Sequence, residues 1–269
     1  MMHKKNYELK KVYLTKDYTR FNEKNYQKKN SPLTERRKII SRFVKKNKIK
    51  SVLDIGCSTG KLIRELKKDN KNLKLYGVDI DKSLIKQAQI NNPNINHDNF
   101  WIDDLSNLKS KSKFDLILCF GLLQFIKNPF KILDKLKNNL NKNGVIIIST
   151  QNFFFNFVSF NDISANFLSK VSNLKNKKFF KISNTFLKSN KTAVNNYFNF
   201  EYDNKEVLNS LYLNDYFKNN SKTLSYMYTD YYNYHHNFLP NKNYNINDQK
   251  DKWKKYFFCS AALHFFKKK

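Results

Sequence analysis

The segment SVLDIGCSTG, residues 51–60, decides the fold of this 269-residue chain. Its first half is a short run rich in β-forming residues, and its second half is a turn with two glycines. The residues that follow, 61–69, place Leu62, Ile63 and Leu66 on one helical face. A strand, a tight turn and a helix are therefore predicted in immediate succession.

The sequence on either side of this segment repeats the same alternation. Further strands are predicted at 75–80, 99–102, 114–119 and 145–150, and helices at 32–44, 83–90 and 129–140. Alternating strands and helices of this kind favour a doubly wound parallel sheet. With two late strands at 223–232 and 256–266, the expected fold class is α/β, a mostly parallel seven-stranded sheet with helices on both faces.

The glycines mark the core of this fold. The chain has only five, and all lie between residues 56 and 144. Four regions are expected: a basic and aromatic N-terminal segment, 1–35; an α/β core, 36–150; a helical, aromatic-rich insertion, 151–222; and a strand pair that completes the sheet, 223–269.

The formal net charge of +29 raises the question of an anionic partner. Clustered basic residues attract phosphates, but nearly all of the charge is lysine, and the bidentate grip on phosphate or guanine favours arginine. A solvated basic surface is the favoured interpretation. Nucleic-acid binding and peripheral contact with an anionic membrane stay open as alternatives.

Several classes of protein are disfavoured. The longest apolar run, 114–126, is interrupted by charge and is too short to span a bilayer, so no transmembrane helix or signal peptide is expected. Cys57, Cys119 and Cys259 form no CxxC pair, so neither a disulfide framework nor a metal site is expected. A reducing cytoplasm is the expected compartment.

Five ordered motifs identify the family. The segment VLDIGCSTG, 52–60, resembles the first motif of class I, Rossmann-like S-adenosylmethionine-dependent methyltransferases, D-x-G-x-G-x-G, with Ser58 in place of the middle glycine. Further matches to that family follow in order at 76–81, 100–105, 114–118 and 144–150. The resemblance implies S-adenosylmethionine as the cofactor and points to the branch that methylates small molecules, quinones and glycans. It also implies that 36–150 is a Rossmann-like core that binds the cofactor, that 1–35 forms a lid over it, and that the insertion 151–222 lies on the substrate side.

The resemblance also assigns roles in the cofactor site. Asp54 would hold the methionine end, Asp79 both ribose hydroxyls and Asp104 the adenine amino group. The full set of expected cofactor-binding residues is Asp54, Gly56, Cys57, Ser58, Gly60, Asp79, Ile80, Asp104, Leu105 and Phe120.

Acids at strand ends also suit a ligand with a sulfonium and an ammonium and no phosphate. The alternatives are structural: Asp54 caps the next helix, Asp79 or Asp81 caps the helix near Ser83, and Asp104 only ends a strand.

The sequence indicates less about the molecule that accepts the methyl group. In-line transfer to oxygen of a small molecule, a lipid or quinone precursor, or a glycan is the expected reaction. The segment Gln124-Phe125-Ile126 replaces the Glu-His-Val of many similar enzymes, which leaves His235 and His236 as candidate bases. Two rival functions stay open: an RNA methyltransferase, and a non-catalytic binding subunit of the same fold.

Overall fold

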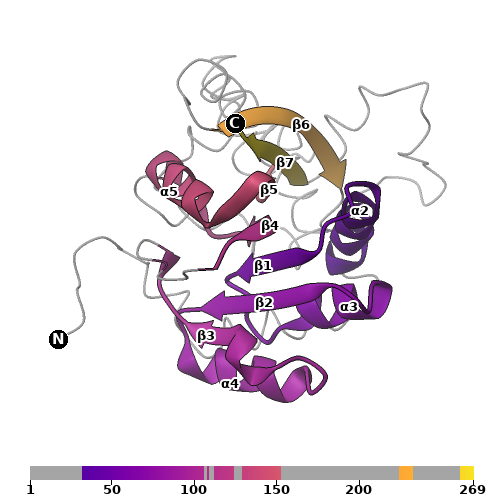
Figure 1. Cartoon of the computed structure of the whole chain (residues 1–269), viewed down its shortest axis with the longest axis vertical. Coiled ribbons are helices and arrows are strands. Elements are labelled where there is room, and N and C mark those ends of the chain that lie inside the picture. Colours follow the sequence, from indigo (N-terminus) through magenta and orange to yellow (C-terminus); the bar gives the residue numbers. More distant parts are fainter. Residues whose placement is uncertain (1–31, 106–107, 109–111, 124–128, 153–223, 233–260) are drawn as a thin grey trace, which may run out of the picture.

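A seven-stranded sheet organises the described part of the chain, which comprises residues 32–105, 108, 112–123, 129–152, 224–232 and 261–269 of the computed structural model. Its strands are β1 Ser51–Ile55, β2 Lys74–Asp79, β3 Phe100–Ile102, β4 Phe114–Phe120, β5 Leu140–Gln151, β6 Leu224–Tyr232 and β7 Ala261–Lys268. They lie in the order β3-β2-β1-β4-β5-β7-β6 (Figure 1).

The strand directions create one switch point in the sheet. The pairs β3-β2, β2-β1, β1-β4 and β4-β5 are parallel, whereas β7 is antiparallel to both of its neighbours. From β1 the chain first adds strands on one side of the sheet, β2 and then β3. It then returns to the other side of β1 and adds β4 and β5, so the switch point lies between β1 and β4. Ligands of open α/β sheets bind at this point, outside the carboxyl ends of the strands.

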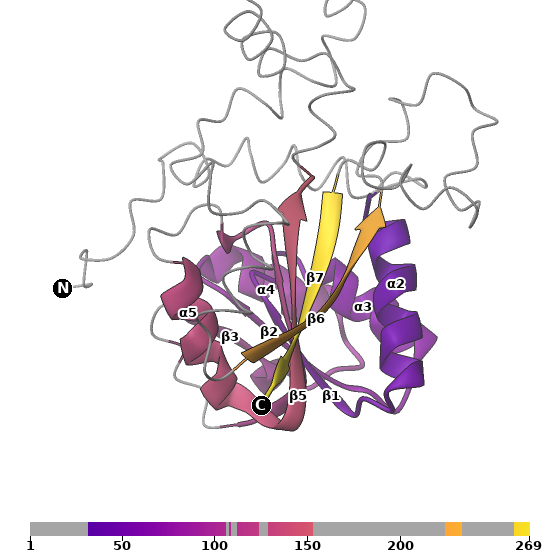
Figure 2. The same cartoon turned by 90° about the horizontal axis from the view of Figure 1, so that it is seen from above.

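Helices cover both faces of the sheet (Figure 2). Helices α2 Pro32–Lys46, α3 Lys61–Asp69 and α4 Lys82–Asn91 contribute to one hydrophobic cluster, and α5 Pro129–Leu136 contributes to the other. Short 3₁₀ turns, η2 His97–Asn99 and η5 Lys137–Asn139, precede β3 and β5. The expected α/β fold, with its mixed seven-stranded sheet, is confirmed.

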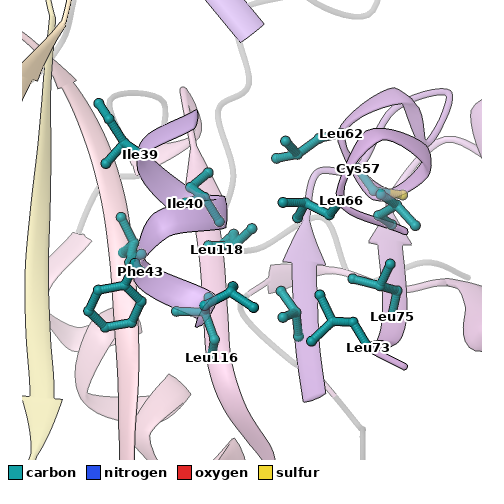
Figure 3. Close-up of a cluster of buried hydrophobic side chains, with 14 of the residues drawn as sticks. Ile39, Ile40, Phe43, Cys57, Leu62, Leu66, Leu73, Leu75, Leu116 and Leu118 are labelled. Atoms are coloured by element: carbon teal, nitrogen blue, oxygen red, sulfur yellow. The ribbon is translucent and has the colours of Figure 1, made fainter. Parts of the chain in front are cut away.

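The packing of α2 against β4 shows why the central strands are apolar. Ile39, Ile40 and Phe43 of α2 lie against Leu116 and Leu118 of β4, as Figure 3 shows. All five side chains are buried, and each contributes about 1.5–3 kcal/mol to folding by the transfer of apolar area from water. A parallel sheet covered on both faces needs such continuous apolar runs.

Two predicted boundaries within the described residues were wrong by more than two residues. The helix predicted over 129–140 ends at Leu136, because a 3₁₀ turn follows and Leu140 already pairs with Phe114. The strand predicted from Val145 begins at Leu140 instead. A register shift between β4 and β5 accommodates the extra residues, and Asn143 takes a positive φ of 65° there.

A buried histidine ties the last two strands to the sheet. His264 of β7 is fully buried, with its Nε2 2.7 Å from Thr150 Oγ1 and its Nδ1 2.9 Å from Thr229 Oγ1. Its ring therefore joins β5, β7 and β6. No helix within the described ranges is long and apolar enough to cross a membrane. The predicted lid and aromatic insertion lie almost entirely outside the described residues.

Candidate functional site

The turn after β1 is held by its backbone. Gly56, Ser58 and Gly60 all have positive φ, at 71°, 50° and 70°. The Gly56 and Cys57 amides donate to the Val78 carbonyl at 2.8 and 3.1 Å, so the turn is fastened to the end of β2. Because Ser58 carries a Cβ, its left-handed conformation is strained, whereas the two glycines adopt theirs freely.

The far end of the turn is packed against α4. Asn92 Nδ2 donates to the Gly60 and Ala88 carbonyls at 3.3 and 2.7 Å, and Asn91 Nδ2 donates to the Thr59 carbonyl at 3.1 Å. A Cβ added to Gly60 would lie 2.5 Å from Asn92 Nδ2. Glycine is therefore required there by space as well as by φ.

Asp54 is a buried carboxylate at the end of β1. Its side chain is only 5% exposed, and no described residue donates a hydrogen bond to it. Burial raises the pKa of Asp54 from its ordinary value of 3.8 to about 7; the Arg36 charge opposes that shift and the Asp79 charge adds to it. Asp54 does not cap the helix that follows, because the N-cap residue of α3 is Gly60 and no side chain caps that helix.

Arg36 of α2 brings a positive charge to the same place. Its side chain is buried, its guanidinium carbon lies 4.4 Å above the centre of the Phe120 ring, and its charge acts on Asp54. The sequence did not indicate this residue. Its only signal was a helix predicted over 32–44, and nothing in that pattern shows which of the adjacent arginines, Arg36 or Arg37, turns inward.

Asp79 links the turn to the end of β2. Its Oδ2 accepts from the Ser58 amide at 2.9 Å, and its Oδ1 accepts from the Asp81 amide at 3.1 Å. Burial raises the pKa of Asp79, and these two hydrogen bonds act against the rise. Each carboxylate oxygen keeps a further lone pair for a ligand.

The structure resolves the capping alternative for this pair of acids. Asp81 is the N-cap of α4, and its side chain accepts from the amides of Ser83 and Leu84. Its pKa is lowered, first by the Ser83 hydroxyl. Asp79 takes no part in that cap and faces the turn instead.

Acids also follow β3. The Asp103 amide donates to the Asp79 carbonyl at 3.1 Å, and the Asp104 amide donates to Asp103 Oδ1 at 2.8 Å. Both aspartates thus lie at the carboxyl edge. Ile80 is 48% exposed beside them, and Leu105 packs against the cluster on the α5 face.

A cavity of about 490 Å³ lies beside this edge but not at Asp54. It covers the β2–β3 side of the sheet and is lined by Tyr76, Asp98, Trp101, Ile102, Asp103, Ser112 and Phe114. It reaches the candidate site only through Ile102 and Asp103. The backbone turn and the acids therefore define the site better than this cavity does.

The described residues include no side chain that was predicted to act in catalysis. His235 and His236 lie outside the described residues. Cys57 and Cys119 are buried, and burial raises the pKa of each thiol, so neither is set up as a nucleophile. Within the described ranges no three His, Cys, Asp or Glu side chains gather into a metal site; the absence of a metal stays a prediction.

The arrangement suits an amino-acid zwitterion joined to a nucleoside. Asp54 offers a buried carboxylate to an ammonium, the buried Arg36 whose charge acts on Asp54 suits a carboxylate, and Asp79 has acceptors for two hydroxyls. S-adenosylmethionine has these groups in that order. Asp54, Gly56, Cys57, Ser58, Gly60, Asp79 and Phe120 are brought together here, with Ile80, Asp104 and Leu105 along the adjoining edge.

Comparison with known proteins agrees with this chemistry. Residues 46–257 match a family described as a methyltransferase domain. The chain is 27% identical over 128 residues to the malonyl-(acyl-carrier protein) O-methyltransferase of Bacillus cereus, covering 47% of this chain and 46% of that protein. It is 33% identical over 116 residues to the tRNA U34 carboxymethyltransferase of Campylobacter jejuni subsp. doylei, covering 42% and 39%. The chain thus spans less than half the length of both relatives.

A solved structure extends the fold comparison over nearly the whole chain. The plantazolicin methyltransferase BpumL, in complex with a pentazolic desmethylPZN analogue and S-adenosylhomocysteine, superposes with a TM-score of 0.54 at 17% identity. The match covers 96% of this chain and 93% of that one. At this identity it supports the fold.

Proposed function

This chain belongs to the methyltransferase-domain family, whose methyl donor is S-adenosylmethionine, and we propose that it binds this donor at Asp54, Arg36 and Asp79. We further propose that it methylates oxygen on a small molecule, a lipid or quinone precursor, or a glycan. The remaining expected cofactor residues, Gly56, Cys57, Ser58, Gly60, Ile80, Asp104, Leu105 and Phe120, line the same edge in this proposal.

The observation that carries the proposal is a buried carboxylate, to which no described residue donates a hydrogen bond, under the charge of a buried guanidinium. Burying an ionisable group is expensive unless a partner compensates for the lost water. Asp54 carries that cost, which its raised pKa expresses. A ligand ammonium would compensate it, and Arg36 would meet the adjoining ligand carboxylate with the planar fork that suits that group.

The bound donor would supply an activated methyl group on a positively charged sulfur. An acceptor oxygen would attack that carbon in line as the carbon–sulfur bond breaks, so the protein's task is to align the two and exclude water. An acceptor hydroxyl must also lose a proton. His235 and His236 remain the proposed groups to take it.

The charge of the site supports a compact acceptor over a nucleic acid. Asp54, Asp79, Asp81, Asp103 and Asp104 all lie at the carboxyl edge of the sheet. Carboxylates along the edge where we propose that the donor binds would repel a phosphate backbone.

Titration of S-adenosylhomocysteine by calorimetry tests the site with an internal control. Asp79→Asn should weaken binding about 10- to 100-fold, because one charged acceptor of the ribose hydroxyls is lost. Asp81→Asn should bind like the wild type, because asparagine caps a helix as well as aspartate does. Equal effects of both variants, or no binding by folded wild type, would contradict the proposed site.

The tRNA-directed relative and the high net charge favour an RNA methyltransferase as the second candidate. Mass spectrometry of small-molecule and RNA pools after incubation with labelled donor separates the two by which product gains the methyl group. A folded protein that binds the donor but gives no product from either pool would instead favour the non-catalytic subunit.

A further inference from the structure

Charge is divided between the two edges of the sheet. The carboxyl edge carries the five aspartates of the candidate site. The opposite, amino edge is formed by the segments that lead into β1, β2, β4 and β5 and by the end of β7, where the C-terminus lies in Figure 2. These segments are rich in lysine.

Eight of these lysines define what we call the amino-edge surface. Their side chains are exposed, and none forms an ion pair within the described part of the chain. They are Lys45, Lys46, Lys48, Lys50, Lys71, Lys74, Lys113 and Lys142. A composition rich in lysine throughout would not by itself concentrate free charge at one edge.

The acidic side chains that the structure describes at this edge form no ion pair with these lysines. Asp69 pairs with Arg37 and accepts from the Ser41 hydroxyl. Asp115 accepts from the Lys50 and Ser51 amides and from Asn141, and these bonds lower its pKa. Asp98, before β3, is exposed, but it lies at the outer end of the edge.

We propose that the amino-edge surface binds the phosphate backbone of a nucleic acid without regard to sequence, on the side of the sheet opposite the cofactor site. Lysine is a point charge that attracts phosphate without reading base edges. The acidic carboxyl edge would repel the same polyanion and so orient it. The nucleic acid would therefore dock at this edge, away from the candidate cofactor site.

The dimensions of the surface fit a phosphate backbone. Its lysines lie before or near the start of four adjacent strands, β2, β1, β4 and β5. With about 4.8 Å between neighbouring strands, the distance from the first of these strands to the last is about 14 Å. That is about four phosphate steps of one strand of a duplex.

Neutral amides and scarce apolar groups favour nucleic acid over a lipid surface. Exposed Asn47, Asn72 and Asn143 alternate with the lysines, and asparagine is a common partner of phosphate and sugar groups. Interfacial membrane binding relies on inserted apolar side chains. Among the described residues, Ile90 at the end of α4 is the one exposed large apolar side chain near this edge.

Two triple variants with equal change of charge test the proposal. Lys50, Lys74 and Lys113 are replaced by Gln in one, and Lys38, Lys82 and Lys86, which are exposed elsewhere, in the other. Each is titrated into a fluorescein-labelled RNA duplex over about 50 to 200 mM salt. The amino-edge triple should reduce the slope of log affinity against log salt by about 3, and the control triple should leave it unchanged.

The other outcomes are equally informative. Equal losses in the two triples would overturn the proposal, since the overall charge would then explain the binding. So would a triple that loses affinity for phosphatidylserine vesicles but keeps its affinity for RNA. Both variants should still bind S-adenosylhomocysteine, which confirms their folding and keeps this test separate from that of the cofactor site.

Discussion

At the scale of single residues, the buried carboxylate of Asp54 that we propose binds the cofactor also lowers the stability of the free protein. The unfolded carboxyl ionises near 3.8, whereas the folded one holds its proton up to about 7. Stability contributed by the protonated folded form is therefore complete below pH 3.8 and is lost as the pH rises through about 7. Above that pH the ionised, buried Asp54 costs the free protein up to about 4 kcal/mol.

Asp54→Asn should remove this cost. We expect the variant to be more stable than the wild type above pH 7, by up to about 4 kcal/mol in urea unfolding, and to lose most of its affinity for S-adenosylhomocysteine. A variant less stable than the wild type at that pH would show that the carboxylate is compensated within the folded protein. Below pH 3.8 the two proteins should unfold alike.

Burial raises the pKa of Asp54, and the Arg36 charge opposes that rise. Because this charge lowers the pKa of Asp54, Arg36→Met should move the pH midpoint of S-adenosylhomocysteine binding upward and weaken binding at every pH. Arg37→Met is the control, since Arg37 pairs with Glu65 and Asp69 instead. Calorimetry across a pH series measures both; a midpoint equal to that of the wild type in Arg36→Met would contradict the coupling.

At the scale of elements, the turn between β1 and α3 holds two nearby positions in a left-handed conformation but leaves space for a side chain at only one of them. Ser58→Gly should relieve a left-handed serine and change stability by no more than about 1 kcal/mol, in either direction. Gly60→Ala should destabilise by about 2 kcal/mol or more, because its Cβ meets Asn92 and its φ is unfavourable. Thermal unfolding compares them; an equal loss in both would show that the left-handed conformation of Ser58 carries no strain that glycine relieves.

Element prediction succeeded where one pattern dominated. The boundaries of β1 and α3 were predicted to the residue, because an apolar run, two glycines and a helical face follow one another without ambiguity. The start of β5 was missed, because Leu140 fits the apolar face of a helix as well as a strand. Pairing with Phe114 of β4 decided the matter, and that contact is not visible along the chain.

At the scale of the whole molecule, two buried groups have opposite effects on stability against pH. Burial lowers the pKa of His264 from 6.5 to about 3, so the unfolded chain takes up a proton that the folded one refuses, and stability is lost as the pH falls below 6.5. Asp54 acts in the reverse direction between 3.8 and 7. From about pH 4 to 6.5 the two slopes, each about 1.4 kcal/mol per pH unit, oppose each other.

Single variants should therefore expose one slope each. Asp54→Asn should lose stability steeply on acidification, and His264→Gln, whose amide can still join Thr150 and Thr229, should lose stability as the pH rises. Urea unfolding at a series of pH values measures both profiles. If His264→Gln shows the same profile as the wild type, His264 does not titrate in this range.

The sequence by itself determined the family, the alternation of strands and helices, and which acids stand at strand ends. Local patterns of apolar residues, glycines and aspartates carry that information, since it depends on neighbours along the chain. Only the tertiary structure decided that the Arg36 charge acts on Asp54 and that Asp81 rather than Asp79 caps α4. It also decided that exposed lysines, with no ion pair within the described part of the chain, gather at the edge opposite the acids. These facts depend on which residues the sheet brings together, and a sheet joins segments that are far apart in the chain.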